Sequence, residues 1–202
     1  MGVKTKERIL LQARRLFSKN GFYATKVEDI SRAAKVNKAT IYYYFDDKRS
    51  LYEEVIYREL SVVAPKVVQL ASADTSLESF VNSLIDVYFD FLFSDVSTFK
   101  LLLREICDGG VYLKRALLRL KEEYAFFKMG GVARRLEEMG VRKRCGLEGL
   151  DFWIGVMGLV TIHFLSEPFV EVIYGRKVDK SYLNEKKEIV KEIVGKILRC
   201  GG

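Results

Sequence analysis

The sequence predicts an all-α protein, and three observations lead to this prediction. Apolar residues recur at spacings of three and four along most of the 202 residues, no segment alternates apolar and polar residues as a half-buried strand does, and only two prolines occur. Apolar residues make up 49% of the chain, which is enough for a core. We expect about nine helices, with a three-helix helix-turn-helix domain over residues 1–47 and a second helical domain over residues 48–202.

Three short helices are expected near the N-terminus. The first covers residues 5–19, where apolar residues recur at i, i+4, i+7 and i+8, and Asn20-Gly21 ends it. Thr25 offers an N-cap to the second helix, and Asn37 offers one to the third, over residues 38–45. Two short helices joined by a tight turn behind a first helix form a helix-turn-helix unit.

Six further helices are expected after this unit. Asp47 caps the first of them, and Pro65 ends or kinks it because proline lacks an N–H and clashes with the preceding turn. The helix at 147–167 is apolar nearly all round, so we expect it to be buried on most sides. The expected ranges of the last five helices are 75–93, 97–107, 111–139, 147–167 and 181–198.

The net charge of +7 lies entirely in the first quarter of the chain. Residues 1–50 hold twelve Lys and Arg against five Asp and Glu, whereas the remaining residues hold 22 of each kind. This asymmetry indicates that a polyanion is bound at one end only, and the alternative is a solvated basic helix.

Residues 21–48 carry a resemblance to a known family. They read GFYATKVEDISRAAKVNKATIYYYFDDK and resemble the DNA-binding signature of the TetR family of transcriptional regulators. The shared features are a Gly-aromatic turn, a Thr before an apolar-x-Asp-Ile helix start, and a Thr-Ile-Tyr-Tyr-Tyr-Phe recognition helix followed by Asp-Lys. Lys35 and Ala39 stand where the family often has glycine, so Lys35 is expected to adopt a left-handed backbone. The resemblance implies a DNA-binding domain followed by a ligand-binding and dimerisation domain.

The third helix has the size and chemistry to enter a major groove. Lys38 can donate to guanine O6 or N7, and Thr40 can bond a base edge or a phosphate. Tyr42 and Tyr43 should be exposed with their hydroxyls toward phosphates, and the alternative for each is packing against the fourth helix. The expected DNA-facing residues of this helix are Asn37, Lys38, Ala39, Thr40, Tyr42 and Tyr43.

The resemblance also implies phosphate contacts on either side of the groove. Thr25 and Lys26 would make them from the start of the second helix, and Lys48 from the start of the fourth. For Lys48 the alternative is a solvated lysine beside Asp46 and Asp47. One such unit reads only a few base pairs, so we expect a homodimer on double-stranded DNA with a palindromic operator.

The last two expected helices are the candidates for the dimer interface. Gly155 and Gly158 are small enough to let two helices approach closely, and an aliphatic stripe on the final helix includes Val190, Val194 and Ile197. Two helices from each copy would then form a four-helix interface, as the resemblance also implies. The alternative is that these stripes only fill the core of a single chain.

Aromatic residues are dense in the middle of the chain. Relatives of the kind implied by the resemblance enclose a small apolar or amphipathic inducer among these helices, although most of the rings must be ordinary core. His163 could orient a polar group of such a ligand, and the alternative is a hydrogen-bonded core histidine. The candidate ligand-binding residues are Phe91, Phe99, Leu103, Tyr124, Phe127, Trp153, Met157 and His163.

These observations predict a homodimeric, DNA-binding transcriptional regulator in the cytoplasm, acting as a repressor that a small ligand releases. The alternative is an architectural or division-control DNA-binding protein without an inducer. No P-loop, GxGxxG or HExxH motif is present and His163 is the single histidine, so we expect no enzyme and no cofactor. Cys107, Cys145 and Cys200 form no CxxC pair, so no metal is expected. The apolar run 150–165 is too short for a membrane span of roughly 18–20 residues.

Overall fold

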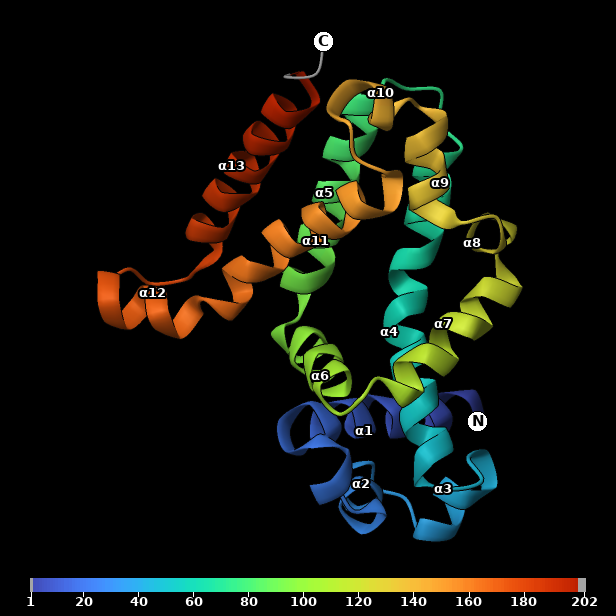
Figure 1. Ribbon diagram of the computed structural model, residues 1–202. Coiled ribbons are helices and arrows are strands. Elements are labelled where there is room, and N and C mark those ends of the chain that lie inside the picture. The colour runs from blue at the N-terminus through green and yellow to red at the C-terminus, as the bar shows by residue number, and fades with distance from the viewer. Residues whose placement is uncertain (1, 200–202) are drawn as a thin grey trace. The chain divides into compact units, whose positions relative to one another are not determined.

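All thirteen secondary-structure elements in the computed structural model, which describes residues 2–199, are α-helices (Figure 1). This confirms the all-α class and corrects the expected count of about nine. The helices are α1 (Gly2–Ala24), α2 (Val27–Ala33), α3 (Lys38–Tyr44), α4 (Lys48–Ala71), α5 (Leu77–Ser94), α6 (Val96–Cys107), α7 (Val111–Glu123), α8 (Ala125–Lys128), α9 (Gly131–Glu138), α10 (Val141–Cys145), α11 (Gly149–Leu165), α12 (Glu167–Tyr174) and α13 (Lys180–Arg199).

Two of the extra helices arise because an expected long helix breaks, and α10 and α12 lie mainly outside the expected ranges. The expected helix over residues 111–139 is three helices, because the backbone is extended at Tyr124 (φ −115°, ψ 115°) and left-handed at Gly130 (φ 99°). The short α10 lies between two further left-handed glycines, Gly140 and Gly146. Of the two breaks within residues 111–139, only the one at Gly130 falls at a residue that disfavours a helix, since the sequence around Tyr124 has no glycine or proline.

Pro65 does not end its helix. The sequence predicts that the helix either ends or kinks at this residue. It does not end there, because α4 continues to Ala71. Proline in a helix interior removes one backbone hydrogen bond, and here the ring lies on the exposed side while the preceding Ala64 is buried.

The chain divides into two compact units. The first unit contains the residues up to Ala64 together with Leu92–Glu123, and the second contains Pro65–Phe91 together with the residues from Tyr124 onward. The first unit therefore holds α6, α7 and most of α4 beside the three N-terminal helices, whereas the sequence placed a domain boundary after residue 47.

The first unit has an aliphatic and aromatic core. Helix α1 packs against α6 and α2, and α2 packs against α3. Ile9, Phe17, Ile30, Ile41 and Leu51 are at most 1% exposed. Burial of each such side chain contributes about 1.5–3 kcal/mol, so the short helices α2 and α3 are held mainly by this packing and not by their own helix propensity.

In the second unit, α11 packs against α9 and α13. Gly149 allows the start of α11 to approach α9, because a Cβ on this residue would lie 2.1 Å from the carbonyl oxygen of Ala133. Its N–H donates to Glu137 at 2.6 Å. Only four residues of α11 are buried, so the expectation that it is buried on most sides is wrong for the single chain. Those four are Gly149, Phe152, Val156 and Val160.

None of the helices described between residues 2 and 199 is by itself long and apolar enough to cross a membrane. One pair, α11 and α12, reaches that length and composition when the two helices are taken together across a bend of 53°.

Candidate nucleic-acid interface

A tight turn joins α2 to α3. Lys35 in this turn has φ 51°, which confirms the left-handed backbone expected there, and Val36 N–H donates to the carbonyl of Ser31 at 3.0 Å. A non-glycine residue in this conformation costs roughly 1–2 kcal/mol. The buried Ile30 and Ile41 on either side of the turn offset that cost by packing.

Asn37 caps α3, as the sequence predicted. Its Oδ1 accepts hydrogen bonds from Thr40 N–H at 2.7 Å and from the Thr40 hydroxyl at 2.6 Å. The hydroxyl hydrogen of Thr40 is thus used inside the helix, and its oxygen remains an acceptor. The amide nitrogen of Asn37 is not used in this cap.

Helix α3 buries one face and exposes the other. Ile41 is 1% exposed and Phe45 6%, whereas Tyr42 is 44% exposed and Tyr43 81%. The expected exposure of both tyrosines is confirmed. Contact of their hydroxyls with phosphate stays a prediction.

Lys38 has an acidic partner that the sequence analysis missed. Its ammonium forms an ion pair with Glu28 of α2 and lies 5.7 Å from the centre of the Tyr42 ring. The hydrogen bond between them lowers the pKa of Glu28 and raises the pKa of Lys38, so both groups are charged at neutral pH. The available signal was the acidic pair Glu28-Asp29 within a segment that carries several lysines.

Thr25 does not occupy the expected position. It is 1% exposed, and its hydroxyl donates to the carbonyl oxygens of Gly21 at 2.7 Å and Leu16 at 3.2 Å. The N-cap of α2 is Lys26 instead, and Lys26 is exposed. The cause is the turn at Gly21 (φ 81°, ψ 173°), which interrupts α1 and leaves its last carbonyls for Thr25 to satisfy. The Thr25 side chain thus joins α1 to α2 and does not face outward.

Lys48 is the first residue of α4. Its ammonium lies 4.4 Å from the centre of the Phe22 ring and 3.4 Å from the carbonyl oxygen of Tyr23, and partial burial lowers its pKa. A cation at a helix N-terminus is disfavoured by roughly 0.3–1 kcal/mol, but an anion bound there is favoured. Asp47 acts as the helix cap by accepting from Ser50 N–H at 2.7 Å, as the sequence predicted.

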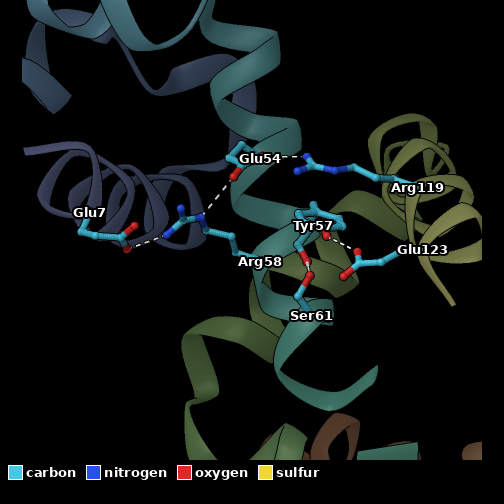
Figure 2. Close-up of polar contacts among 7 residues, drawn as sticks. All are labelled: Glu7, Glu54, Tyr57, Arg58, Ser61, Arg119 and Glu123. Carbon is cyan, nitrogen blue, oxygen red and sulfur yellow. Dashed lines mark hydrogen bonds and ion pairs between the residues drawn. The ribbon is translucent and has the colours of Figure 1, made fainter. Parts of the chain in front are cut away.

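Ion pairs connect α1, α4 and α7 within the first unit (Figure 2). Arg58 of α4 bonds Glu7 of α1 and Glu54 at 3.2 Å, and Arg119 of α7 bonds Glu54 at 2.7 Å. Burial alone would raise the pKa of Glu54, yet hydrogen bonds from Arg119 and Arg58 lower it below its ordinary value. Tyr57 donates to Glu123, which adds a further link between α4 and α7.

A buried carboxylate connects α6, α7 and α4. Glu105 is 3% exposed and accepts from the N–H groups of Tyr112 at 2.7 Å and Leu113 at 3.2 Å, which caps α7. Burial and then the nearby Glu105 raise the pKa of Tyr52, so this phenol remains protonated. Tyr52 also packs edge-on against Phe17 at 4.8 Å between ring centres. The C-terminal part of α1 therefore packs, through Phe17, against a tyrosine that belongs to a buried hydrogen-bonded network.

The structure does not bring all eight candidate ligand-binding residues into one unit. Phe99 and Leu103 lie on α6 in the first unit, and the other six lie in the second. Rings pair locally, as for Trp153 and Tyr88 at 6.2 Å and Tyr124 and Phe127 at 6.0 Å. Burial and then Lys186 lower the pKa of His163. The six in the second unit are Phe91, Tyr124, Phe127, Trp153, Met157 and His163.

Between residues 2 and 199, no three His, Cys, Asp or Glu side chains gather closely enough to hold a metal ion. Cys107 is exposed and Cys145 half-buried as free thiols, and Cys200 lies outside the described residues.

Three helices of the second unit, α11, α12 and α13, carry exposed large apolar side chains, which we call together the apolar face. Its α11 members are 45–55% exposed. A Cβ added at Gly155 or Gly158, which lie between them in the sequence, would meet no atom within 4 Å beyond the adjacent residues and the backbone of α11 itself. The apolar face consists of Leu150, Ile154, Ile162 and Leu165 of α11, Phe169, Val172, Ile173 and Tyr174 of α12, and Ile193 and Ile197 of α13.

Two candidate interface residues of α13 do not belong to this face. Val190 is 0% and Val194 1% exposed, so both lie in the core of the chain, as the alternative reading of this stripe held. They stand one turn apart on the inner side of α13, whereas Ile193 and Ile197 repeat on the outer side. Ile197 is 37% exposed and remains a candidate.

Comparisons with known proteins agree with this geometry. Residues 9–55 match the family described as bacterial regulatory proteins, tetR family. A Bacillus subtilis (strain 168) protein named probable HTH-type transcriptional regulator YttP is 27% identical over 217 aligned positions, which cover 100% of this chain and 97% of that protein.

Two further proteins differ in the part of the chain they match. The Staphylococcus aureus biofilm operon icaADBC HTH-type negative transcriptional regulator IcaR is 39% identical over 51 residues, 25% of this chain and 27% of that protein. A structure of the transcriptional regulator FadR from Bacillus subtilis in complex with stearoyl-CoA has a TM-score of 0.66 and 16% identity, covering 97% of this chain and 98% of that one. The likeness to FadR shows a shared fold.

Proposed function

The chain belongs to the TetR family of bacterial regulatory proteins, and from that premise we propose that two copies bind a palindromic operator and repress transcription until a small apolar or amphipathic molecule releases them. As a transcriptional regulator of the TetR type, it must present one element to the base edges of DNA. The exposed face of α3 carries this proposal, because Lys38, Tyr42 and Tyr43 are uncovered on a helix whose other face is buried.

The proposed binding mode assigns a task to each group of this surface. Lys38, Ala39 and Thr40 enter the major groove, where Ala39 permits close approach. Tyr42 and Tyr43 bond phosphates with their hydroxyls. Lys26 and Lys48 neutralise phosphates on either side, and the N-terminus of α4 adds a partial positive charge beside Lys48.

The apolar face supports the proposed homodimer. A monomer rarely exposes this many large aliphatic and aromatic side chains on neighbouring helices, and a two-fold axis would bury the same surface of both copies. Gly155 and Gly158 lie within it and permit close packing of two α11 helices. Ile197 of α13 then lies at the interface, and Val190 and Val194 support it from inside the chain.

The proposed ligand response is supported by the FadR structure, which holds stearoyl-CoA in a chain of the same fold. A ligand releases DNA only if it binds better to a conformation in which the two α3 helices do not fit the operator. The candidate residues remain those predicted from the sequence. Because the matched relatives are transcription regulators, we propose no catalytic activity and a cytoplasmic location.

Binding of the full chain to the duplex upstream of its own gene tests this function, with a scrambled duplex of equal length and composition as the control. At about 0.2 M salt, non-specific attraction to phosphates is weak. Strong preference for the native duplex is the expected result, and a screen for small molecules that abolish it would follow. Equal weak binding to both duplexes would favour the alternative of an architectural DNA-binding protein.

A further inference from the structure

The ion pair between Glu28 and Lys38 lies on the part of the first unit that we propose to face DNA. It joins α2 to α3, and both side chains are about half exposed, at 53% and 48%. The Tyr42 ring lies beneath the ammonium and restricts where it can point. The ammonium and the carboxylate therefore lie side by side at the surface, and the positions of α2 and α3 determine which of them lies on which side.

Stability is a poor reason for this pair. An exposed ion pair contributes roughly 0–1 kcal/mol. A carboxylate near DNA is also repelled by phosphates. The next residue, Asp29, already has a basic partner in Arg32 at 3.5 Å, and Lys26 and Lys35 are basic. Glu28 would weaken DNA binding unless its oxygens accept hydrogen bonds from the DNA itself.

Both groups keep hydrogen-bonding capacity after they have bonded each other. An ammonium has three N–H donors, so two remain on Lys38 after one is given to Glu28. The carboxylate of Glu28 uses Oε1 for this bond, and Oε2 remains an acceptor. The pair thus offers two donors beside one acceptor.

This pattern complements a G·C base pair in the major groove. Guanine presents two acceptors, N7 and O6, and cytosine presents one donor, the N4 amino group, next to O6. Guanine O6 and cytosine N4 are hydrogen-bonded to each other, as are the ammonium and the carboxylate, so the two pairs of groups have similar spacing. We infer that Glu28 and Lys38 read one G·C pair together, with Lys38 on guanine N7 and O6 and Glu28 on cytosine N4.

An A·T pair at the same position does not complement Glu28 and Lys38 at the two groups in the middle of the major-groove edge. Adenine N6 is a donor where guanine O6 is an acceptor, and thymine O4 is an acceptor where cytosine N4 is a donor. Lys38 would face a donor and Glu28 an acceptor, with the thymine methyl group beside the carboxylate. A lysine alone could choose guanine on either strand, so Glu28 determines which strand carries it. Glu28 is then a specificity-determining residue of α2, and this role rests on the proposed DNA-binding function.

The test selects binding sites for the full chain from a pool of duplexes with randomised base pairs. The wild-type protein should enrich a half-site with one invariant G·C pair. The double variant Glu28→Lys with Lys38→Glu keeps an ion pair but reverses its order, so guanine should move to the opposite strand at that position only. A matched swap on α13, Glu192→Lys with Lys196→Glu, should leave the selected site unchanged.

A single variant covers the case in which the reversed pair no longer binds DNA. Glu28→Gln should lower the preference for G·C over A·T at this position about ten-fold, with smaller effects at other positions. An unchanged site in the reversed variant, unchanged discrimination in Glu28→Gln, or a wild-type site without an invariant G·C pair would overturn the inference. No enrichment by the wild-type protein would instead overturn the proposed function itself, and this inference with it.

Discussion

The α3 surface and the apolar face both expose large side chains, but they differ in what those side chains can bond. Tyr42 and Tyr43 of α3 carry hydroxyls and have Lys38 among them, whereas Ile154, Ile162 and the other α11 members of the apolar face carry no polar group. Exposed tyrosines can be satisfied by phosphates, and exposed isoleucines only by other apolar surface. The exposure of a side chain does not by itself show what kind of molecule it binds. The polar or apolar character of its exposed atoms does.

The helices of both units are joined by ion pairs between residues far apart in sequence as well as by apolar packing. In the first unit, Arg14 of α1 forms an ion pair with Glu59 of α4 at 2.9 Å. In the second unit, Lys191 of α13 forms one with Asp86 of α5 at 2.7 Å. The following predictions compare buried with exposed groups of these units and then test the α3 surface, from the largest expected effect to the smallest.

A charge introduced on the inner side of α13 should destabilise the folded chain, whereas a charge on the outer side should separate the two copies of the dimer. Val194→Glu places a carboxylate in the core and should lower the free energy of unfolding by more than about 3 kcal/mol, because a buried unpaired charge is costly. Ile197→Glu, one turn away from Ile193 on the outer side, should leave the chain folded and make it monomeric. Urea denaturation and sedimentation velocity measure the two effects. A dimer that survives Ile197→Glu would move the interface elsewhere.

The buried carboxylate of the first unit should matter more than an exposed one. Glu105→Ala removes the cap of α7 and the partner of Tyr52, and should lower the free energy of unfolding by about 2 kcal/mol. Glu192→Ala breaks an exposed pair with Lys196 and should change it by less than about 0.5 kcal/mol. Chemical denaturation compares them, and equal effects would show that the Glu105 network contributes no special stability.

Acid should weaken the first unit through Glu54. Its pKa in the folded chain lies below the ordinary value of 4.5, so its contribution to stability is complete above about that pH and is lost as the pH falls through the folded pKa. Glu54→Gln should cost about 1 kcal/mol at pH 7, and the difference from the wild type should shrink below pH 4.5. Urea midpoints measured over this pH range give the result. A difference that stays constant with pH would contradict the role of the ionised carboxylate.

Lys48→Ala tests the phosphate contact at the start of α4. Binding should weaken for all sequences alike, and the slope of log K against log salt should flatten by about one. Lys196→Ala on α13 serves as the control for a lost surface charge. A changed base preference would assign Lys48 to base readout.

Tyr42→Phe is expected to have the smallest effect. It keeps the ring beneath Lys38 and removes only the hydroxyl, so operator affinity should fall by roughly three- to ten-fold if that hydroxyl bonds a phosphate. Titration of a fluorescent duplex measures the change. An unchanged affinity would mean that Tyr42 acts only through its ring.

Local features of the helix-turn-helix unit could be predicted from the sequence. The cap at Asn37, the left-handed Lys35 and the exposed tyrosines depend on neighbours within a few residues, and all three are confirmed. The prediction that Thr25 caps α2 is wrong, because its hydroxyl donates to the carbonyls of Leu16 and Gly21 in the preceding helix.

Features that depend on distant partners could not be predicted. Helical spacing shows that α13 has an apolar stripe, but it does not show which part of the stripe another helix covers. The sequence therefore predicts Val190 and Val194 at an interface, whereas both lie in the core. The link between Glu105 and Tyr52 joins residues on different helices without any local pattern. The break at Tyr124 likewise has no breaker residue.

Hydrogen–deuterium exchange of the full chain, with and without its selected duplex, tests the division of tasks most directly. The account predicts that duplex binding slows exchange mainly in residues 26–48, while α11, α12 and α13 exchange equally in both states. Protection concentrated in α11–α13, with none in residues 26–48, would contradict the assignment of DNA to the α3 surface.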